Sequence, residues 1–163
     1  MANRRGTSKV DYKAKPWMSR SPLAASSRPT PWRNGCRQSD QLRAATTAQI
    51  IAAAFGVEAH VDVRLREQSL GELEGTLSSQ LRAEPTPPGH HISEIAWGGG
   101  ESLQQVHKRC MAFLADVDAE PTIIVSHGDT LRVMLAVLAG RSHRDVDWVP
   151  IGNTDVLHRS HRP

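Results

Sequence analysis

A short apolar strand that leads directly into a helix start is the feature that most constrains the fold of this chain. After Pro121, residues 122–125 (TIIV) are β-branched, and the run stops at Ser126, His127 and Gly128. Such a run is typical of a strand in a parallel sheet. Ligands bind at the carboxyl ends of strands in open α/β sheets, and a helix N-terminus presents free N–H groups to an anion. The pattern predicts an anion site beside His127; the alternative is an imidazole that only bonds a backbone carbonyl.

Two elements are predicted earlier in the chain. Ser39 or Asp40 is suited to cap a helix, and Gly56 is a stop signal at its far end. From Val57 to Leu65, apolar and polar residues alternate, which is the spacing of a strand with one buried face. The apolar positions of the predicted helix are Leu42, Ala45, Ile50 and Ala53.

The later elements complete an α/β pattern. Ser102 and Gln105 form a capping box at the start of a helix, and another helix is predicted from Asp129 or Thr130 to Gly140. Residues 76–100, rich in proline and glycine, are predicted to be a long loop of the kind found at active sites. The order of elements favours a three-layer α/β/α domain with a mainly parallel sheet. The apolar stripe of the capped helix is Leu103, Val106, Cys110, Phe113, Leu114 and Val117.

The positive charge of the chain is concentrated at its front. Residues 1–43 hold 10 Lys or Arg and 2 acidic residues, whereas residues 44–163 hold 10 Lys or Arg and 15 acidic residues. Clustered cations attract nucleic-acid phosphates without reading sequence, so a nucleic-acid-binding arm is one hypothesis. Apart from Trp17 and Trp32, the front has no interleaved aromatic residues and no recognisable binding module, which disfavours that hypothesis.

The domain boundaries are predicted from this difference between the basic front of the chain and the remainder. Residues 19–38 show neither helical nor alternating periodicity, so they are predicted to be an irregular linker. We therefore expect residues 1–38 to be a basic, poorly ordered segment, residues 39–157 to form the α/β domain and residues 158–163 to be a polar tail.

Cysteine usage and hydropathy indicate the compartment. Cys36 and Cys110 are the only cysteines and lie far apart, which argues against a zinc site and a disulfide framework. No apolar run approaches the roughly 20 residues of a membrane span. A cytoplasmic protein without membrane attachment is expected.

Five short motifs occur in order over about 115 residues. Together they resemble the motifs of the histidine phosphatase superfamily, whose members are phosphoglycerate mutase-like. Any one of them alone would be a weak signal, but five in the right order are specific. The motifs span residues 39–48 (SDQLRAATTA), 65–75 (LREQSLGELEG), 99–103 (GGESL), 125–128 (VSHG) and 152–154 (GNT).

The resemblance implies roles for individual residues. Arg43 would bind phosphate, His127 would be the second catalytic histidine, and Glu67 would be the proton donor. The residue chemistry agrees, because a guanidinium matches phosphate oxygens and a half-buried carboxyl can be tuned to donate a proton. Without the motif order, Glu67 would be interpreted as a solvated loop carboxylate. The resemblance implies neither a metal nor a cofactor, and the remaining expected positions are Gly128 at the phosphate and Glu101 and Asn153 at the pocket rim.

One position departs from the family pattern. The reaction implied by the resemblance begins with a nucleophilic histidine in an R-H-G turn, and the only matching triplet here is Arg4-Arg5-Gly6. Arg4 would keep the phosphate-binding arginine, but Arg5 stands in place of the nucleophile. A guanidinium stays protonated and has no free lone pair, so it cannot accept a phosphoryl group.

The sequence therefore leaves three functional hypotheses. The first is phosphomonoester hydrolysis or phosphoryl transfer, weakened or abolished by Arg5. The second is a noncatalytic pseudoenzyme that binds a phosphorylated small molecule, a phosphoprotein or another protein. The third is the nucleic-acid-binding arm. The domain is expected to be incomplete at its N-terminal part, as a shifted reading frame or a decayed gene copy would leave it, and the sequence does not specify an oligomeric state.

Overall fold

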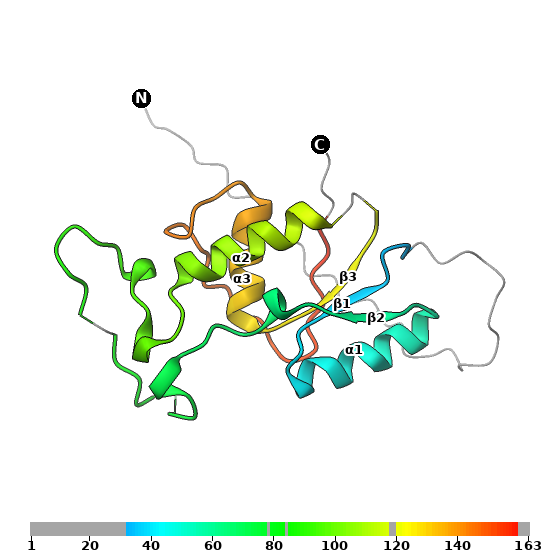
Figure 1. Ribbon diagram of the computed structural model, residues 1–163, viewed down its shortest axis with the longest axis horizontal. Helices are drawn as coiled ribbons and strands as arrows, with labels where there is room; N and C mark the ends of the chain where they lie inside the picture. The colour runs from blue at the N-terminus through cyan, green and yellow to red at the C-terminus, as the bar shows by residue number, and fades with distance from the viewer. Residues whose placement is uncertain (1–31, 78, 84, 118–119, 160–163) are drawn as a thin grey trace.

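A parallel sheet forms the centre of the protein in a computed structural model, which describes residues 32–77, 79–83, 85–117 and 120–159. The strands are β1 (Cys36–Gln38), β2 (Ala59–Val61) and β3 (Ile123–Val125), in the spatial order β2-β1-β3. Cys36 of β1 is in register with Ala59 of β2 and with Ile123 of β3. The crossover from β1 to its parallel neighbour β2 contains α1 (Leu42–Phe55), the crossover from β2 to β3 contains α2 (Leu103–Asp116), and α3 (Gly128–Leu138) follows β3 (Figure 1).

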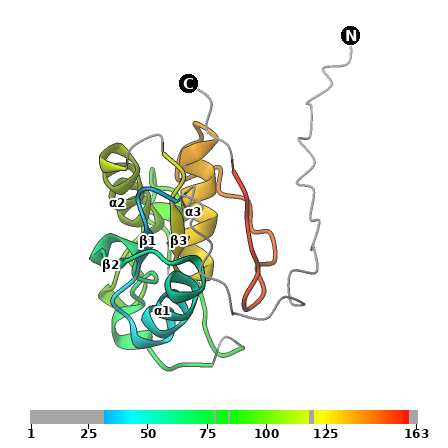
Figure 2. The same cartoon turned by 90° about the vertical axis from the view of Figure 1, so that its right-hand side faces the viewer.

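Helices cover both faces of this sheet, so the predicted three-layer α/β class is confirmed. Figure 2 shows α1 on one side and α2 with α3 on the other. Successive side chains of β3 point to opposite faces of the sheet. Ile123 and Val125 pack with Cys36 beneath α1, whereas Ile124 packs against the core on the other face.

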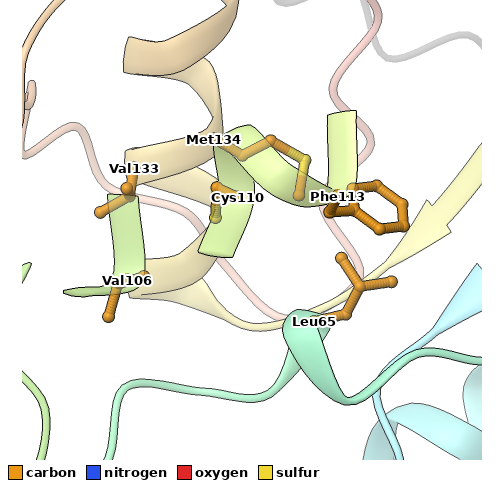
Figure 3. Packing of buried hydrophobic residues seen from close by; sticks show 6 residues of the cluster. All are labelled: Leu65, Val106, Cys110, Phe113, Val133 and Met134. Carbon is orange, nitrogen blue, oxygen red and sulfur yellow. The ribbon is translucent and has the colours of Figure 1, made fainter. Parts of the chain in front are cut away.

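The larger core lies between α2, α3 and the chain that follows β2. The predicted capping box is present, since the Ser102 hydroxyl accepts the N–H of Gln105 and the Gln105 side chain accepts the N–H of Ser102 at 2.8 Å. The helix that it starts directs one apolar face inward, as the sequence predicted. The buried members of this core are Leu65, Val106, Cys110, Phe113, Val133 and Met134 (Figure 3).

The apolar residues through which this helix was predicted to run do not form its buried face. Leu42 and Ile50 are 82% and 67% exposed, and small residues face the sheet instead. Alanine has no atoms beyond Cβ, so its side of the helix lies closest to the strands. The helix begins at Leu42 after Gln41, which makes no side-chain cap, although it ends at Gly56 as predicted. The buried residues of α1 are Ala44, Ala48 and Ala52.

The strand predicted from Val57 to Leu65 is much shorter than expected. Only Ala59–Val61 pairs, and Val63–Leu65 forms a 3₁₀ turn. Val61, at the end of the edge strand β2, and Val63, in the turn that follows, are each 58% exposed. Of the predicted buried face, only Leu65 is fully buried.

A larger correction concerns β1. Residues 36–38 were predicted to belong to an irregular linker, yet they form the middle strand of the sheet. The segment CRQ has no apolar alternation, so it gave no strand signal, and pairing on both sides stabilises it. The domain therefore begins before residue 39. Residues 1–31 and 160–163, with Arg4 and Arg5, lie outside the described residues, and the predictions for them remain predictions.

The 76–100 segment is largely irregular, as predicted, with short 3₁₀ turns at Ile92–Glu94 and Trp97–Gly99. A buried hydroxyl connects it to the rest of the domain. Ser93 is 2% exposed, and its Oγ lies 2.7 Å from Nδ1 of His91 and 2.8 Å from Nδ1 of His143. His91 Nδ1 accepts the N–H of Ser93, so it is unprotonated and also accepts the hydroxyl proton. His143 must then donate its Nδ1–H to Ser93.

No helix in the described part of the chain is long and apolar enough to cross a membrane.

The small residues under α1 predict an asymmetric response to substitution. Ala48 is fully buried, so Ala48→Leu should lower the free energy of unfolding by about 1–3 kcal/mol through overpacking. Ile50→Ala, on the exposed face, should change it by less than about 0.5 kcal/mol. Urea titration of both variants measures this. A larger loss in the Ile50 variant would contradict the orientation of α1.

The connection through Ser93 predicts a pH dependence. Burial lowers the pKa of His143, and His107, Arg144 and His91 lower it further, whereas Glu94 opposes them. The folded state therefore binds this proton less readily than the unfolded state, and stability is lost as pH falls below about 6.5. His143→Gln should make the free energy of unfolding less dependent on pH between about 7.5 and 5.5. An unchanged slope in denaturation series would exclude His143 as a contributor.

Candidate active site

Three predicted site residues follow three neighbouring strands. Arg43 lies in the first turn of α1 after β1, Glu67 follows the turn after β2, and His127 is the residue between β3 and α3. Because the strands are parallel, their carboxyl ends lie at one edge of the sheet. A cavity of about 250 Å³ opens there and is lined almost entirely by polar and charged side chains, including Arg43, Glu67, Glu101 and Arg109.

The Arg43 guanidinium determines the tautomer of His127. Its Nε–H donates to Nδ1 of His127 at 3.2 Å, so the ring proton of the neutral imidazole is on Nε2. His127 is 8% exposed, and within the described residues its Nε2 is buried and has no hydrogen-bond partner. Burial, followed by the charges of Arg43 and Arg109, lowers the pKa of His127 to about 4. At neutral pH the site therefore holds an uncharged donor that has no acceptor among the described residues.

Arg43 itself carries an unneutralised charge. Within the described part of the chain its partners are His127 and the side-chain oxygen of Gln41, which its Nη2 reaches at 3.1 Å, and no carboxylate is paired with it. The nearby Arg66, in contrast, forms a close ion pair with Asp40. Arg43 is thus the site cation best able to bind an anion bidentately.

Glu67 is half-buried rather than solvated. Its Oε1 accepts the N–H of Gln68 at 3.1 Å and the N–H of Thr130 at 3.3 Å, which places the carboxyl at the start of α3. Burial raises the pKa of Glu67, the charge of Asp129 adds to this effect, and the backbone N–H bonds oppose it. A raised pKa favours a carboxyl that can deliver a proton, and the interpretation as a surface carboxylate does not fit this environment.

The two expected rim residues differ in position. Glu101 lines the cavity, where Arg109 donates from Nε to its Oε1 at 3.0 Å and from Nη2 to its Oε2 at 3.2 Å. Asn153 does not line the cavity within the described residues. It lies in an exposed turn where the N–H of Gly152 donates to Asp155 at 2.6 Å. The rim assignment of Asn153 stays a prediction, because residues 149–159 form no regular element that places it at the sheet edge.

Gly128 is the first residue of α3, and a Cβ there would come within 3.0 Å of the Arg132 guanidinium. Neither Gly128 nor His127 lines the described cavity directly. Among the described residues there is no cluster of three or more His, Cys, Asp or Glu side chains able to hold a metal ion.

Two residues that the sequence did not single out, Gln41 and Thr130, form hydrogen bonds with the predicted site residues. Gln41 Oε1 accepts from Arg43 and also from the N–H of Glu67 at 3.4 Å, so it bridges two strand ends. Thr130 is fully buried and contacts the carboxylate of Glu67. The signal for Gln41 was its place two residues before Arg43 in the same motif. Nothing local distinguished Thr130 from an ordinary helix residue.

The fold and the site together consist of a parallel sheet with helices on both faces and, at its carboxyl edge, a cation, a neutral imidazole and a half-buried carboxyl. The family model described as histidine phosphatase superfamily (branch 1) matches residues 23–162. The chain therefore belongs to the histidine phosphatase superfamily.

Similar proteins agree with this assignment. The chain is 36% identical over 104 residues to phosphoglycerate mutase-like protein 4 of Arabidopsis thaliana, covering 58% of this chain and 45% of that protein. It is 30% identical over 117 residues to the glucosyl-3-phosphoglycerate phosphatase of Mycobacterium tuberculosis, covering 61% and 52%. The chain thus spans about half the length of the curated relatives that it matches.

Solved structures show the same likeness. A mycobacterial glucosyl-3-phosphoglycerate phosphatase superimposes with a TM-score of 0.57 at 27% identity, over 68% of this chain and 61% of that one. A structure of this mycobacterial phosphatase in complex with inorganic phosphate gives a TM-score of 0.55 at 27% identity, over 68% and 60%.

The contact between Arg43 and His127 predicts that, in addition to burial, the charge of Arg43 lowers the pKa of His127. NMR titration should give His127 a pKa of about 4. Arg43→Met should raise that pKa by removing a neighbouring cation. Arg82→Met is the matched control, because the exposed Arg82 donates, within the described parts of the chain, only to backbone carbonyls. If His127 titrates identically in all three proteins, Arg43 does not control its protonation.

Proposed function

We propose that this chain binds phosphate monoesters at the carboxyl edge of its sheet and turns them over only at background level. Arg43 carries the proposal, because it lines the cavity and also contacts His127, whose buried Nε2–H has no partner among the described residues and suits an incoming phosphoryl oxygen. Leaving a buried donor unpaired costs about 1–3 kcal/mol, and a bound phosphoryl oxygen would offset that cost.

The three side chains supply different parts of phosphate-ester chemistry. Arg43 binds nonbridging oxygens through its guanidinium. His127, neutral above a pKa of about 4, donates Nε2–H to an oxygen whose negative charge grows as the phosphoryl group transfers. Glu67, whose raised pKa favours the protonated form, supplies a proton to the leaving oxygen.

Turnover needs a nucleophile in addition to these groups. The triplet Arg4-Arg5-Gly6, which lies outside the described residues, has arginine where the superfamily resemblance implies the nucleophilic histidine. A permanently protonated guanidinium cannot form the phosphoryl intermediate. The functional consequence is a protein that retains groups for binding and for leaving-group protonation but lacks the group for covalent catalysis.

The ligand is inferred to be phosphorylated and polar. The cavity of about 250 Å³ exceeds the size of a phosphate group alone, and Val63 is the only apolar side chain among those that line it in the described residues. A compact leaving group with its own hydrogen-bonding atoms fits this lining. The mycobacterial relative whose structure contains inorganic phosphate supports phosphate as the first probe to use.

Calorimetric titration of the chain with inorganic phosphate at low salt tests binding. Arg43→Met and His127→Phe should each weaken phosphate affinity about tenfold or more, since a hydrogen bond to a charged group contributes about 1.5–3 kcal/mol. Arg82→Met should leave the affinity unchanged. Equal binding by all the variants, or no binding by the wild type, would refute the site.

A phosphatase assay tests the second part of the proposal. The wild-type chain should hydrolyse p-nitrophenyl phosphate at the background rate, and Arg5→His should raise turnover by orders of magnitude if position 5 is the nucleophile position. Robust wild-type hydrolysis that is lost in His127→Phe but unaffected by Arg5→Ala would contradict the proposal and indicate a different nucleophile.

A further inference from the structure

The backbone just before Glu67 is held by side chains from three separate parts of the fold. The carbonyl of Arg64 accepts from Arg109 Nη1 at 2.5 Å, and the carbonyl of Leu65 accepts from Ser126 Oγ at 2.7 Å. The carbonyl of Arg66 accepts from Thr130 Oγ1 at 2.5 Å. These donors come from α2, from the residue after β3 and from α3. Three consecutive carbonyls are therefore fixed immediately ahead of the acidic residue.

The backbone just after Glu67 is held by Glu101. Its Oε2 accepts the N–H of Ser69 at 3.2 Å, and its own N–H donates to the carbonyl of Ser69 at 2.8 Å. Its carbonyl accepts from the Gln68 side chain at 2.8 Å. Glu101 is also the ion-pair partner of Arg109, which is only 14% exposed. The Glu101–Arg109 pair thus connects both flanks of Glu67.

The hydrogen bonds of Thr130 complete this network, and the donor and the acceptor of each can be assigned. Its hydroxyl accepts from Arg109 Nη2 at 3.4 Å and has one proton, which it donates to the carbonyl of Arg66. The 3.5 Å approach of the same hydroxyl to Glu67 Oε1 is therefore a contact without a donated proton. The N–H of Thr130 is the group that donates to that carboxylate oxygen, at 3.3 Å.

We propose that Arg109, Ser126 and Thr130 are positioning residues that hold the Glu67 carboxyl at the cavity, with Thr130 the most important because it contacts both the backbone and the carboxylate. The proposal rests on the proton-donor role given to Glu67 under the proposed function. A proton donor must stay within hydrogen-bond reach of the leaving oxygen, and a loop residue has no regular element to keep it there. Three donors from α2, α3 and the end of β3 supply that restraint.

A purely structural role is the competing explanation, because buried carbonyls need donors in any protein. The two explanations differ in what happens to the carboxyl. If the donors only satisfy the backbone, their loss lowers stability but leaves the surroundings of the Glu67 carboxyl unchanged. If they position Glu67, their loss lets the carboxyl move toward solvent, and its protonation equilibrium changes.

The test is a titration of side-chain carboxyl carbons by NMR on the full-length chain labelled with carbon-13, with Glu67→Gln used to assign the resonance. In Thr130→Val, which keeps the shape and the backbone N–H, the pKa of Glu67 should fall toward that of an exposed glutamate. Thr130→Ser, which keeps the hydroxyl, should titrate like the wild type. A folded Thr130→Val protein in which Glu67 titrates like the wild type would overturn the proposal.

A second variant keeps the test decisive. Ser126→Ala removes one of the three donors and should shift the titration of Glu67 in the same direction by a smaller amount. If neither variant folds, the donors serve the fold and the proposal is overturned. Binding of inorganic phosphate to the wild type and to Arg43→Met separates the two inferences, because it reports on the proposed function without involving Thr130.

Discussion

The parallel pairing of β1 with β2 on one edge and β3 on the other is the constraint on which the rest of the structure depends. It brings the residues after three strands to one edge of the sheet, although Arg43 and His127 are 84 positions apart in sequence. The pairing also creates two faces, which α1 covers on one side and α2 with α3 on the other. Without β1 in the middle, neither the layers nor the site would form.

Electrostatics at the sheet edge follow from this placement. A guanidinium beside a buried imidazole disfavours a second positive charge, so His127 stays neutral and keeps its donor on Nε2. The same edge buries Glu67 near Asp129, which disfavours a second negative charge. One environment therefore holds a permanent cation, a neutral donor and a carboxyl whose pKa is raised. Groups of this kind are complementary to a phosphoryl group that gains negative charge and loses a leaving oxygen.

Specific polar contacts connect the long irregular segments to the rest of the domain. Ser93 connects the 76–100 segment to His143, and Glu101 with Arg109 fixes the chain on both sides of Glu67. Segments without regular structure have unpaired backbone groups, so buried side chains must satisfy them. Glu101 and Arg109, which make the second set of contacts, also line the cavity.

The sequence by itself determined the family, the α/β class, the capping box at Ser102, the break from β3 into α3 and the residues Arg43, Glu67 and His127 as site candidates. These are local patterns, and their order along the chain carries the information. Only the tertiary structure decided that β1 is the middle strand, that alanines face the sheet from α1, and that Thr130 and Gln41 contact Glu67. Strand pairing and contacts between distant residues depend on which surfaces meet, and no local pattern encodes that.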